Sequence, residues 1–369
     1  MIYFEFLSVY MEICSAKRFN FAKKMFDFII VGLGIAGWSF VRQLQENKRS
    51  FVVFDTSAEN STLASAGVFN PVILKRFTLA WKAAEYLPYA LLQYKKYELE
   101  NTGHQFIYDL PIYRKLTSVA EQNEWSSVSG RPVFEKYMNG ISHEHLPGIE
   151  SPFGFGVMKN TGMIDVNLLL SVLRKQLKKQ NLLRENRFDY KRVRFVKNHI
   201  EYEGLKAKYI VFTEGFGLKK NPFFGHLPLM GTKGESILVK LSKPVNMIIK
   251  SNIFLAPLPG TGLHMAGATY NWTDKSLTPT SEARIHLAEK LQKLYHEPFE
   301  IVGQKAGIRP TVKDRRPLLG RHGEYENLFV FNGLGTRGVI LAPRLAKMLF
   351  EHIVFDIPLP EKVDIKRFG

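Results

Sequence analysis

Three glycines at positions 32, 34 and 37 form the pattern best suited to ligand chemistry in this chain. They follow the apolar run 26–31 and precede residues 38–45, whose apolar side chains recur at helical spacing. Gly32 permits a tight turn, Gly34 lets a pyrophosphate approach the backbone, and Gly37 allows close packing of the helix. This context predicts a dinucleotide site, with an ordinary glycine turn as the alternative.

The residues beside this turn complete the predicted phosphate and ribose contacts. Ile35 and Ala36 lie at the start of the helix, where free backbone N–H groups attract phosphate oxygens. Asp55 ends the next apolar run, 51–54, and Thr56 follows it. A carboxylate here can accept hydrogen bonds from the adenosine ribose hydroxyls. It would repel a 2′-phosphate, which disfavours NADP.

A second glycine pattern near the C-terminus bears on the choice between FAD and NAD. Gly333, Gly335 and Gly338 lie between the apolar run 328–331 and a final helix predicted to end near residue 352. A helix N-terminus at this point could face the negative charge that develops on a reduced flavin ring. This favours FAD, although an ordinary strand–helix turn and an NAD-dependent dehydrogenase remain as alternatives.

The elements between the two turns predict an α/β fold. Its parts are a Rossmann-like FAD-binding domain with a parallel sheet and helices, and an inserted α+β substrate domain with a mixed or antiparallel sheet. Helices are predicted at 77–100 with a kink at Pro88, at 166–179 after an Asp165 N-cap, and at 281–295. Strands are predicted at 209–212, 236–239, 247–249 and 263–266.

The length of 369 residues suggests two domains, at roughly 150 residues each. The FAD-binding domain is expected to combine residues 25–80, 155–225 and 300–369. The substrate-binding domain is expected to combine residues 81–154 and 226–299.

Residues 1–24 are predicted to be a dispensable extension before the first strand. Their apolar part contains Glu5 and Glu12 and has no preceding Lys or Arg, which is a poor match to a signal peptide. No uninterrupted apolar run of about 18 residues occurs, so no membrane span is predicted. A single cysteine, Cys14, excludes an intramolecular disulfide and fits a cytoplasmic location. The scattered histidines predict no metal site.

The net charge of +17 allows attraction to nucleic acid or to other anionic ligands. Ten Lys and Arg residues gather between positions 174 and 197. This stretch fits either a solvated helix face with a hairpin or a surface that contacts tRNA.

Five blocks in this order resemble the D-amino-acid-oxidase-like family of FAD enzymes, which includes glycine and sarcosine oxidases. The blocks are residues 29–37, 64–67, 210–215, 307–310 with 314–320, and 333–343, and the match covers nearly all of 26–355. The resemblance implies FAD as the cofactor. Cys14 precedes the fold, so a cysteinyl link is excluded and FAD is expected to be non-covalent.

The resemblance also implies which residues hold FAD. The loop with Ser65, Ala66 and Gly67 would contact the phosphates or ribityl chain, Val193 would lie near the adenine, and Gly215 would lie beside the cofactor. The C-terminal turn would hold the flavin ring, and the backbone N–H groups at the end of this turn would contact the pyrimidine edge of the flavin. The residues of the turn are Gly335, Thr336, Arg337, Gly338 and Val339.

Arg309 matches the family position that binds the substrate carboxylate, and a guanidinium can hold a carboxylate through two hydrogen bonds. The alternative is a structural salt bridge, with Asp314 as its partner. Tyr270, at the end of a predicted strand, is a second candidate catalytic residue, with aromatic packing as the alternative.

The resemblance implies oxidation of a carbon–nitrogen bond of an amino-acid-like substrate by hydride transfer to flavin N5. One substrate class is a small amino acid or secondary amine. The other follows from residues 313–318 and 335–338, which resemble the oxidase half of the bacterial tRNA wobble-uridine modification enzyme. That enzyme acts on a carboxymethylaminomethyl group, so tRNA would be the partner. The loop 66–71 departs from its pattern, and a non-catalytic flavin- or RNA-binding protein is the remaining alternative.

Overall fold

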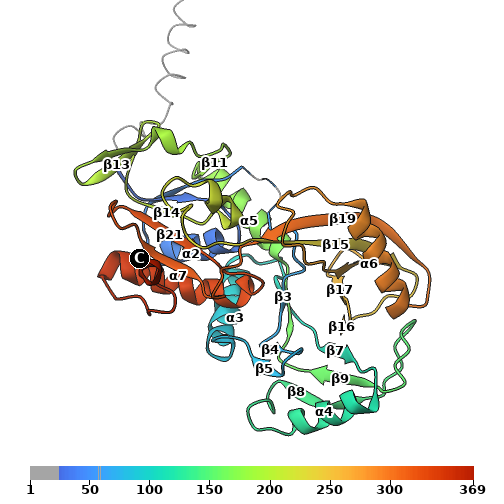
Figure 1. The fold of residues 1–369 in the computed structure, drawn as a ribbon. Helices are drawn as coiled ribbons and strands as arrows, with labels where there is room; N and C mark the ends of the chain where they lie inside the picture. Colours follow the sequence, from blue (N-terminus) through green and yellow to red (C-terminus); the bar gives the residue numbers. More distant parts are fainter. Residues whose placement is uncertain (1–24, 57, 59) are drawn as a thin grey trace, which may run out of the picture.

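The computed structural model describes residues 25–56, 58 and 60–369, which form two lobes that the chain visits in alternation (Figure 1). The first lobe is built on a parallel sheet and the second on a mostly antiparallel one. No helix of the described residues combines the length and apolar character needed to cross a membrane.

The first lobe contains the predicted parallel sheet. Its central strands are β2 (Phe51–Phe54), β1 (Met25–Val31), β14 (Leu205–Phe212) and β21 (Leu328–Asn332), each parallel to the next. The parts of these strands that pair in the middle of the sheet, residues 29–31, 51–54, 210–212 and 328–331, are apolar and buried, because both faces of the sheet are covered. The short β11 (Leu183–Arg184) extends one edge, β12 (Arg194–Val196) and β13 (His199–Tyr202) form an antiparallel extension, and β20 (Leu318–Arg321) pairs with β21. The predicted Rossmann-like fold class is confirmed.

Four helices bury their apolar sides in one core with this sheet. They are α2 (Ile35–Glu46), α3 (Ala83–Glu100), α5 (Val166–Lys179) and α7 (Gly338–Phe355). The α5 bounds match the sequence prediction, and its Asp165 carboxylate accepts the Leu168 N–H at 2.9 Å as an N-cap. Helix α3 begins at residue 83 instead of 77, because residues 78–79 pair with 72–73 as β5 and β4. It continues past Pro88.

The second lobe is an eight-stranded sheet in the order β19-β15-β18-β17-β16-β7-β9-β8. Its strands are β19 (Phe299–Arg309), β15 (Thr232–Leu241), β18 (Leu263–Gly267), β17 (Phe254–Leu258), β16 (Ile248–Lys250), β7 (Ile112–Lys115), β9 (Phe155–Met158) and β8 (Met138–Ser142). One face packs against α6 (Ser281–Leu294), and α4 (Val119–Ser129) packs on the other. Only β16 and β7 pair in parallel among these described strands, so the predicted mixed sheet is confirmed.

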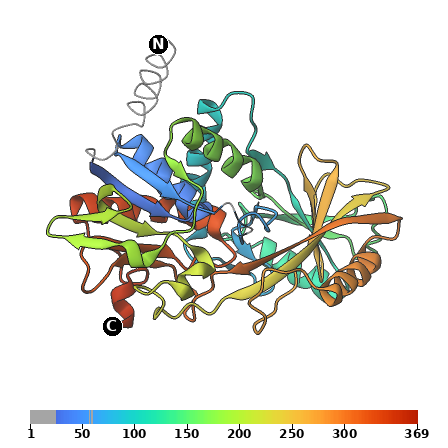
Figure 2. The ribbon, with the colours of Figure 1, turned by 90° about the horizontal axis from the view of Figure 1, so that it is seen from above.

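The strand pairing and helix packing correct the predicted domain boundaries at three places. Helix α3 belongs to the first lobe, since it packs against α7 and α2. Strand β9 and most of β19 belong to the second sheet, although 155–225 and 300–369 were expected in the first domain. Pairing between distant strands decides these assignments, and local sequence patterns do not reveal it. Figure 2 shows β19 crossing the second lobe toward the first.

A three-stranded sheet connects the lobes. It consists of β3 (Val68–Phe69), β10 (Gly162–Ile164) and β6 (Ile107–Asp109), all antiparallel. Because β3 directly follows residues 64–67, this sheet fixes that loop between the two lobes.

Candidate active site

The two glycine turns, about 300 residues apart in sequence, meet at one cavity of about 1210 Å³ between the lobes. A Cβ added at Gly338 would lie 2.8 Å from Ile35 Cγ2, so the starts of α7 and α2 are in contact range. Both turns contribute residues to the cavity wall, together with the ends of β14, β18 and β19. The convergence predicted from the sequence is therefore present.

The first turn requires glycine for steric reasons. Gly32 has φ of +98°, and a Cβ there would lie 2.8 Å from the Thr213 carbonyl oxygen. A Cβ at Gly37 would lie 2.2 Å from the Gly32 carbonyl oxygen. Gly37 does not line the cavity, so its role is the predicted packing of α2 on β1, while Gly32, Gly34, Ile35 and Ala36 do line it.

Asp55 lines the cavity as predicted and also holds the glycine turn in place. Its Oδ1 accepts the Leu33 N–H at 2.8 Å, and its Oδ2 pairs with the Arg174 guanidinium from α5. The Thr62 hydroxyl accepts the Ile35 N–H at 3.1 Å. Sequence reasoning missed both Arg174 and Thr62. Arg174 stood inside the basic stretch, and Thr62 lies directly before the 64–67 block.

The 64–67 loop lies against the cavity, as the resemblance implied. Ser65, Ala66 and Gly67 all line it, and so does Thr56. Gly67 has φ of +68°, and a Cβ there would lie 1.9 Å from the Ile164 carbonyl oxygen of β10.

The end of the cavity expected to hold the adenine is lined by Asn186, Arg187, Phe188 and Tyr190. Val193, which was expected there, does not line the cavity and packs against the aromatic core beneath it. Val193 directly follows the short helix at 190–192, and its expected contact with the adenine stays a prediction.

A buried carboxyl group, that of Glu214, lies beside this end. The Tyr190 hydroxyl donates to its carboxylate, and Asn221 Nδ2 donates to it at 2.8 Å. Burial raises the pKa of Glu214 despite these hydrogen bonds. The next residue, Gly215, lines the cavity as expected.

The second turn presents the N-terminus of α7 to the same cavity. Gly335, Thr336, Gly338 and Val339 line it, and no side chain caps the helix. The first N–H groups of such a helix lack partners within the helix. Arg337 is the exception in this predicted set, since it does not line the cavity and its Nη1 donates to the Asn70 carbonyl oxygen at 2.7 Å.

Arg309 lies at the end of β19, on the cavity wall. Its guanidinium lies 4.4 Å from the centre of the Tyr270 ring, and Nη1 donates to the Thr269 carbonyl oxygen at 3.3 Å. A Cβ at Gly234 would lie 2.1 Å from Arg309 Nη2, so this glycine makes room for the guanidinium. Burial lowers the pKa of Arg309, yet a guanidinium stays charged in proteins.

The structural alternative for Arg309 is wrong, because Asp314 pairs with Arg367 at 2.9 Å instead. Within the described residues Arg309 forms no ion pair. It therefore retains most of its donors for a ligand. Tyr270 packs on the Arg309 guanidinium and also lines the cavity, with 64% of its surface exposed, and its catalytic role stays a prediction.

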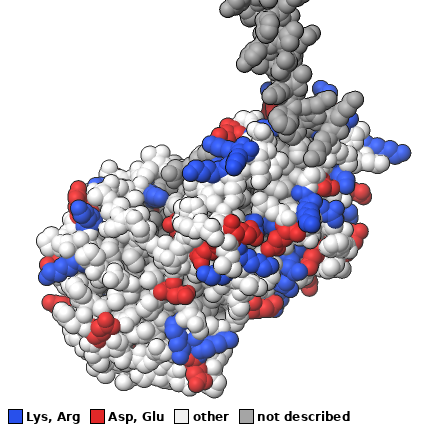
Figure 3. All heavy atoms as spheres, turned by 180° about the vertical axis from the view of Figure 1, so that it is seen from behind, with Lys and Arg blue, Asp and Glu red and all other residues white. Residues whose placement is uncertain are grey.

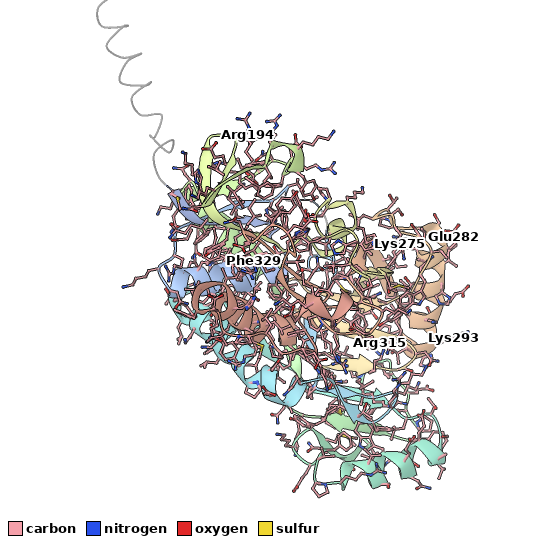
Figure 4. The ribbon with its side chains drawn as sticks, turned by 60° about the vertical axis from the view of Figure 1, so that its left-hand side comes forward. Arg194, Lys275, Glu282, Lys293, Arg315 and Phe329 are labelled. Atoms are coloured by element: carbon pink, nitrogen blue, oxygen red, sulfur yellow. The ribbon has the colours of Figure 1, made fainter. Side chains whose placement is uncertain are left out.

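The basic stretch 174–197 divides between internal pairs and solvent. Arg174 pairs with Asp55, Lys178 with Glu185 at 2.8 Å, and Arg192 with Glu203 at 2.6 Å. Arg194 projects from the hairpin at the outer end of the first lobe (Figure 4). On the face drawn in Figure 3, Lys and Arg side chains alternate with Asp and Glu. Three of the ten basic residues of this stretch therefore form ion pairs in the described structure.

Residues 27–352 match the family described as DAO, FAD dependent oxidoreductase. The chain belongs to this family. FAD is accordingly its cofactor, and the alternative of an NAD-dependent dehydrogenase is excluded.

Among curated relatives of this DAO-family chain, the MnmC protein of Idiomarina loihiensis, named for tRNA 5-methylaminomethyl-2-thiouridine biosynthesis, is 28% identical over 38% of this chain and 25% of its own. The glycine oxidase of Geobacillus kaustophilus is 29% identical over 32% of each chain. MnmC of Leptospira interrogans is 22% identical over 92% of this chain and 59% of its own. The chain thus spans less than two thirds of the length of each of these relatives.

Solved structures show the same fold. The glycine oxidase of Geobacillus kaustophilus superposes with a TM-score of 0.75 at 18% identity, covering 94% of this chain and 98% of that one. Iminodiacetate oxidase from Chelativorans sp. BNC1 gives a TM-score of 0.74 at 17% identity, covering 91% and 97%.

The cavity of this DAO-family chain fits FAD on two observations. Gly215 and Gly335 line it with φ of +54° and +57°, and a Cβ at either would meet no atom within 4 Å, so both face open space. The starts of α2 and α7 bring backbone N–H groups to the same cavity, where they suit a pyrophosphate and an electron-rich ring edge. Small-ligand sites occupy about 300–1,000 Å³, so this larger cavity has room for a dinucleotide and a substrate.

Proposed function

We propose that this protein oxidises a carbon–nitrogen bond of an amino acid or N-substituted glycine, with FAD bound non-covalently. The observation that carries this is Arg309, a partly buried guanidinium without an acidic partner in the described structure, on the wall of the cavity where the two glycine turns meet. A buried cation of this kind is stabilised when it binds an anion. A substrate carboxylate is the anion that suits the family chemistry.

The chain's own residues would bind and orient this substrate. Arg309 would hold the carboxylate through two parallel hydrogen bonds, which fixes the direction of the adjacent carbon. Tyr270 limits the movement of the guanidinium by packing on one face, and Gly234 allows it to lie close to β15. When bound, FAD supplies the hydride acceptor. Catalysis then rests on orientation, which can contribute several kcal/mol to lowering a barrier.

Two kinds of substrate are consistent with this site: a small amine such as glycine, sarcosine, proline or a D-amino acid, and the carboxymethylaminomethyl group of a tRNA uridine. The names of the glycine oxidase and MnmC relatives support both. Each kind offers the carboxylate and secondary or primary amine that the site requires.

The test begins with the visible spectrum of the purified protein and with anaerobic titration by each candidate substrate. We expect a flavin spectrum, a colourless pellet with yellow supernatant on acid precipitation, and bleaching of the flavin by at least one candidate. Bleaching would exclude a non-catalytic flavin- or RNA-binding protein. Protein that binds FAD but is bleached by none of these amines would overturn the proposed activity.

A further inference from the structure

The cavity wall contains a further cation, Lys250, at the end of β16. Its side chain is half-buried, and within the described residues its ammonium group makes no hydrogen bond or ion pair. Burial lowers the pKa of Lys250, and Arg114 and Lys290 lower it further as neighbouring cations. Among the described residues no carboxylate pairs with Lys250, so this part of the chain does not compensate its charge.

Two other basic side chains, one beside Lys250 and one on the cavity wall, do have partners. Arg114 pairs with Glu121 at 3.2 Å, and Lys275 donates to the carbonyl oxygens of Gly231 and Trp272 at 2.9 and 2.6 Å. Lys290, on α6, is half-buried on the cavity wall and, among the described residues, has no such partner either. Lys250 and Lys290 thus form a small cationic group that faces the cavity.

The sheet separates this group from Arg309. Strands β15, β18 and β17 lie between β19 and β16, so four strand spacings, roughly 19 Å in total, divide Arg309 from Lys250. The register across these strands aligns Lys250 with Lys305, four residues before Arg309 on β19. Even with both side chains extended toward one another, their charged groups remain on the order of 10 Å apart.

We propose that Lys250, assisted by Lys290, forms a second anion-binding subsite for the substrate, on the order of 10 Å from the carboxylate bound by Arg309. The part of this proposal in which Arg309 binds the substrate carboxylate rests on the proposed function. The anion is a phosphate or a carboxylate at the far end of the amine substituent. A free glycine or sarcosine is too short to reach it, so the subsite favours a long N-substituted glycine, such as one carried by a nucleotide.

Binding to the FAD-containing protein tests the subsite without turnover, through the change in flavin absorbance. The probes are the dicarboxylates suberate and sebacate, each compared with its monocarboxylate, octanoate or decanoate, and glutarate as a short dicarboxylate. We expect a long dicarboxylate to bind about ten-fold or more tightly than its monocarboxylate. This gain is the effect of one charge-assisted hydrogen bond between the second carboxylate and Lys250. Glutarate should gain nothing over pentanoate.

The substitution Lys250→Met should abolish this preference, because Met replaces the aliphatic part of the lysine side chain and lacks its ammonium group. Lys240→Met is the matched control, since Lys240 is exposed on β15 of the same sheet and does not line the cavity. A preference that is absent from the unaltered protein, or that survives Lys250→Met, would overturn the subsite.

A second comparison identifies the source of the anion. Carboxymethylaminomethyluridine is compared with its 5′-monophosphate; tighter binding of the monophosphate that Lys250→Met removes assigns the subsite to phosphate. If the long dicarboxylates bind more tightly but the monophosphate does not, the subsite is assigned to a carboxylate. If the long dicarboxylates behave as expected but no amine bleaches the flavin, the subsite stands and the proposed oxidation fails. If amines bleach the flavin while the dicarboxylates gain nothing, only the subsite fails.

Discussion

Replacing Arg309 by alanine removes the group that the proposed reaction most depends on. A bidentate bond to a carboxylate comprises two charge-assisted hydrogen bonds, each contributing about 1.5–3 kcal/mol. Because water competes for both groups and the contributions are not additive, about 3 kcal/mol in total is expected, which is about 100-fold in substrate affinity or reduction rate. Arg309→Lys keeps the charge but loses the paired geometry, so a loss of about 10-fold is expected.

The fold should tolerate these changes. Arg309 contributes one cation–π contact, at 4.4 Å from the Tyr270 ring, and one hydrogen bond of 3.3 Å. A cation–π contact stabilises by about 0.5–2 kcal/mol. No carboxylate among the described residues loses its partner when Arg309 is removed. The flavin content and melting temperature should therefore stay close to those of the unaltered protein.

The assay is anaerobic stopped-flow reduction of the flavin by the best N-substituted glycine and by its amide, which lacks the carboxylate. Arg309→Ala should weaken the reaction of the acid about 100-fold and change that of the amide little. Arg321→Ala, an exposed arginine on β20, is the control. Equal losses for acid and amide, or no loss with FAD retained, would refute the assignment of the carboxylate to Arg309.

Three further outcomes follow from the cofactor end of the cavity. Gly37→Ala places a methyl group 2.2 Å from the Gly32 carbonyl oxygen, so thermal denaturation and the flavin-to-protein ratio should both show losses, with about 1–3 kcal/mol of stability removed. Arg174→Met removes the cation beside Asp55, and fluorescence titration should show FAD binding weakened several-fold. An unchanged affinity for FAD would show that the Arg174–Asp55 pair does not help to position the first glycine turn. The raised pKa of Glu214 means that folding favours its protonated form, so stability is lost as pH rises through that pKa. Glu214→Gln should therefore melt higher than the unaltered protein by a larger margin at pH 8 than at pH 5, and a margin independent of pH would contradict this sign.

The sequence predicts well those parts of the fold whose signals are local. An apolar strand, a glycine turn and a helix follow one another at Met25–Glu46 and again at Leu328–Phe355, and the structure has both units. The bounds of α5 were predicted to the residue because Asp165 supplies a local cap and Gln180 ends the apolar periodicity.

The features that the sequence did not predict depend on contacts between distant residues. Arg174 meets Asp55 across 119 positions, and no local pattern selects it from the other basic residues near it. Strands β9 and β19 join the second sheet through partners outside their own neighbourhood. No local pattern marked Lys250, because its place on the cavity wall beside Lys290 and Arg114 depends on how distant strands and helices of the described structure come together.

A backbone hydrogen bond joins Arg309, which would bind the substrate carboxylate, to the second glycine turn, which would hold the flavin. Residue Pro310 follows Arg309, and its carbonyl oxygen accepts the Gly335 N–H at 3.1 Å, directly before α7. One end of β19 therefore determines the position of the guanidinium and the start of the helix that faces the cofactor. Since misplacement by about 1 Å can cost about 100-fold in rate, this bond provides the rigidity that the proposed chemistry needs. The two lobes then act as one site, with Arg309 held relative to the flavin turn and not merely to its own sheet.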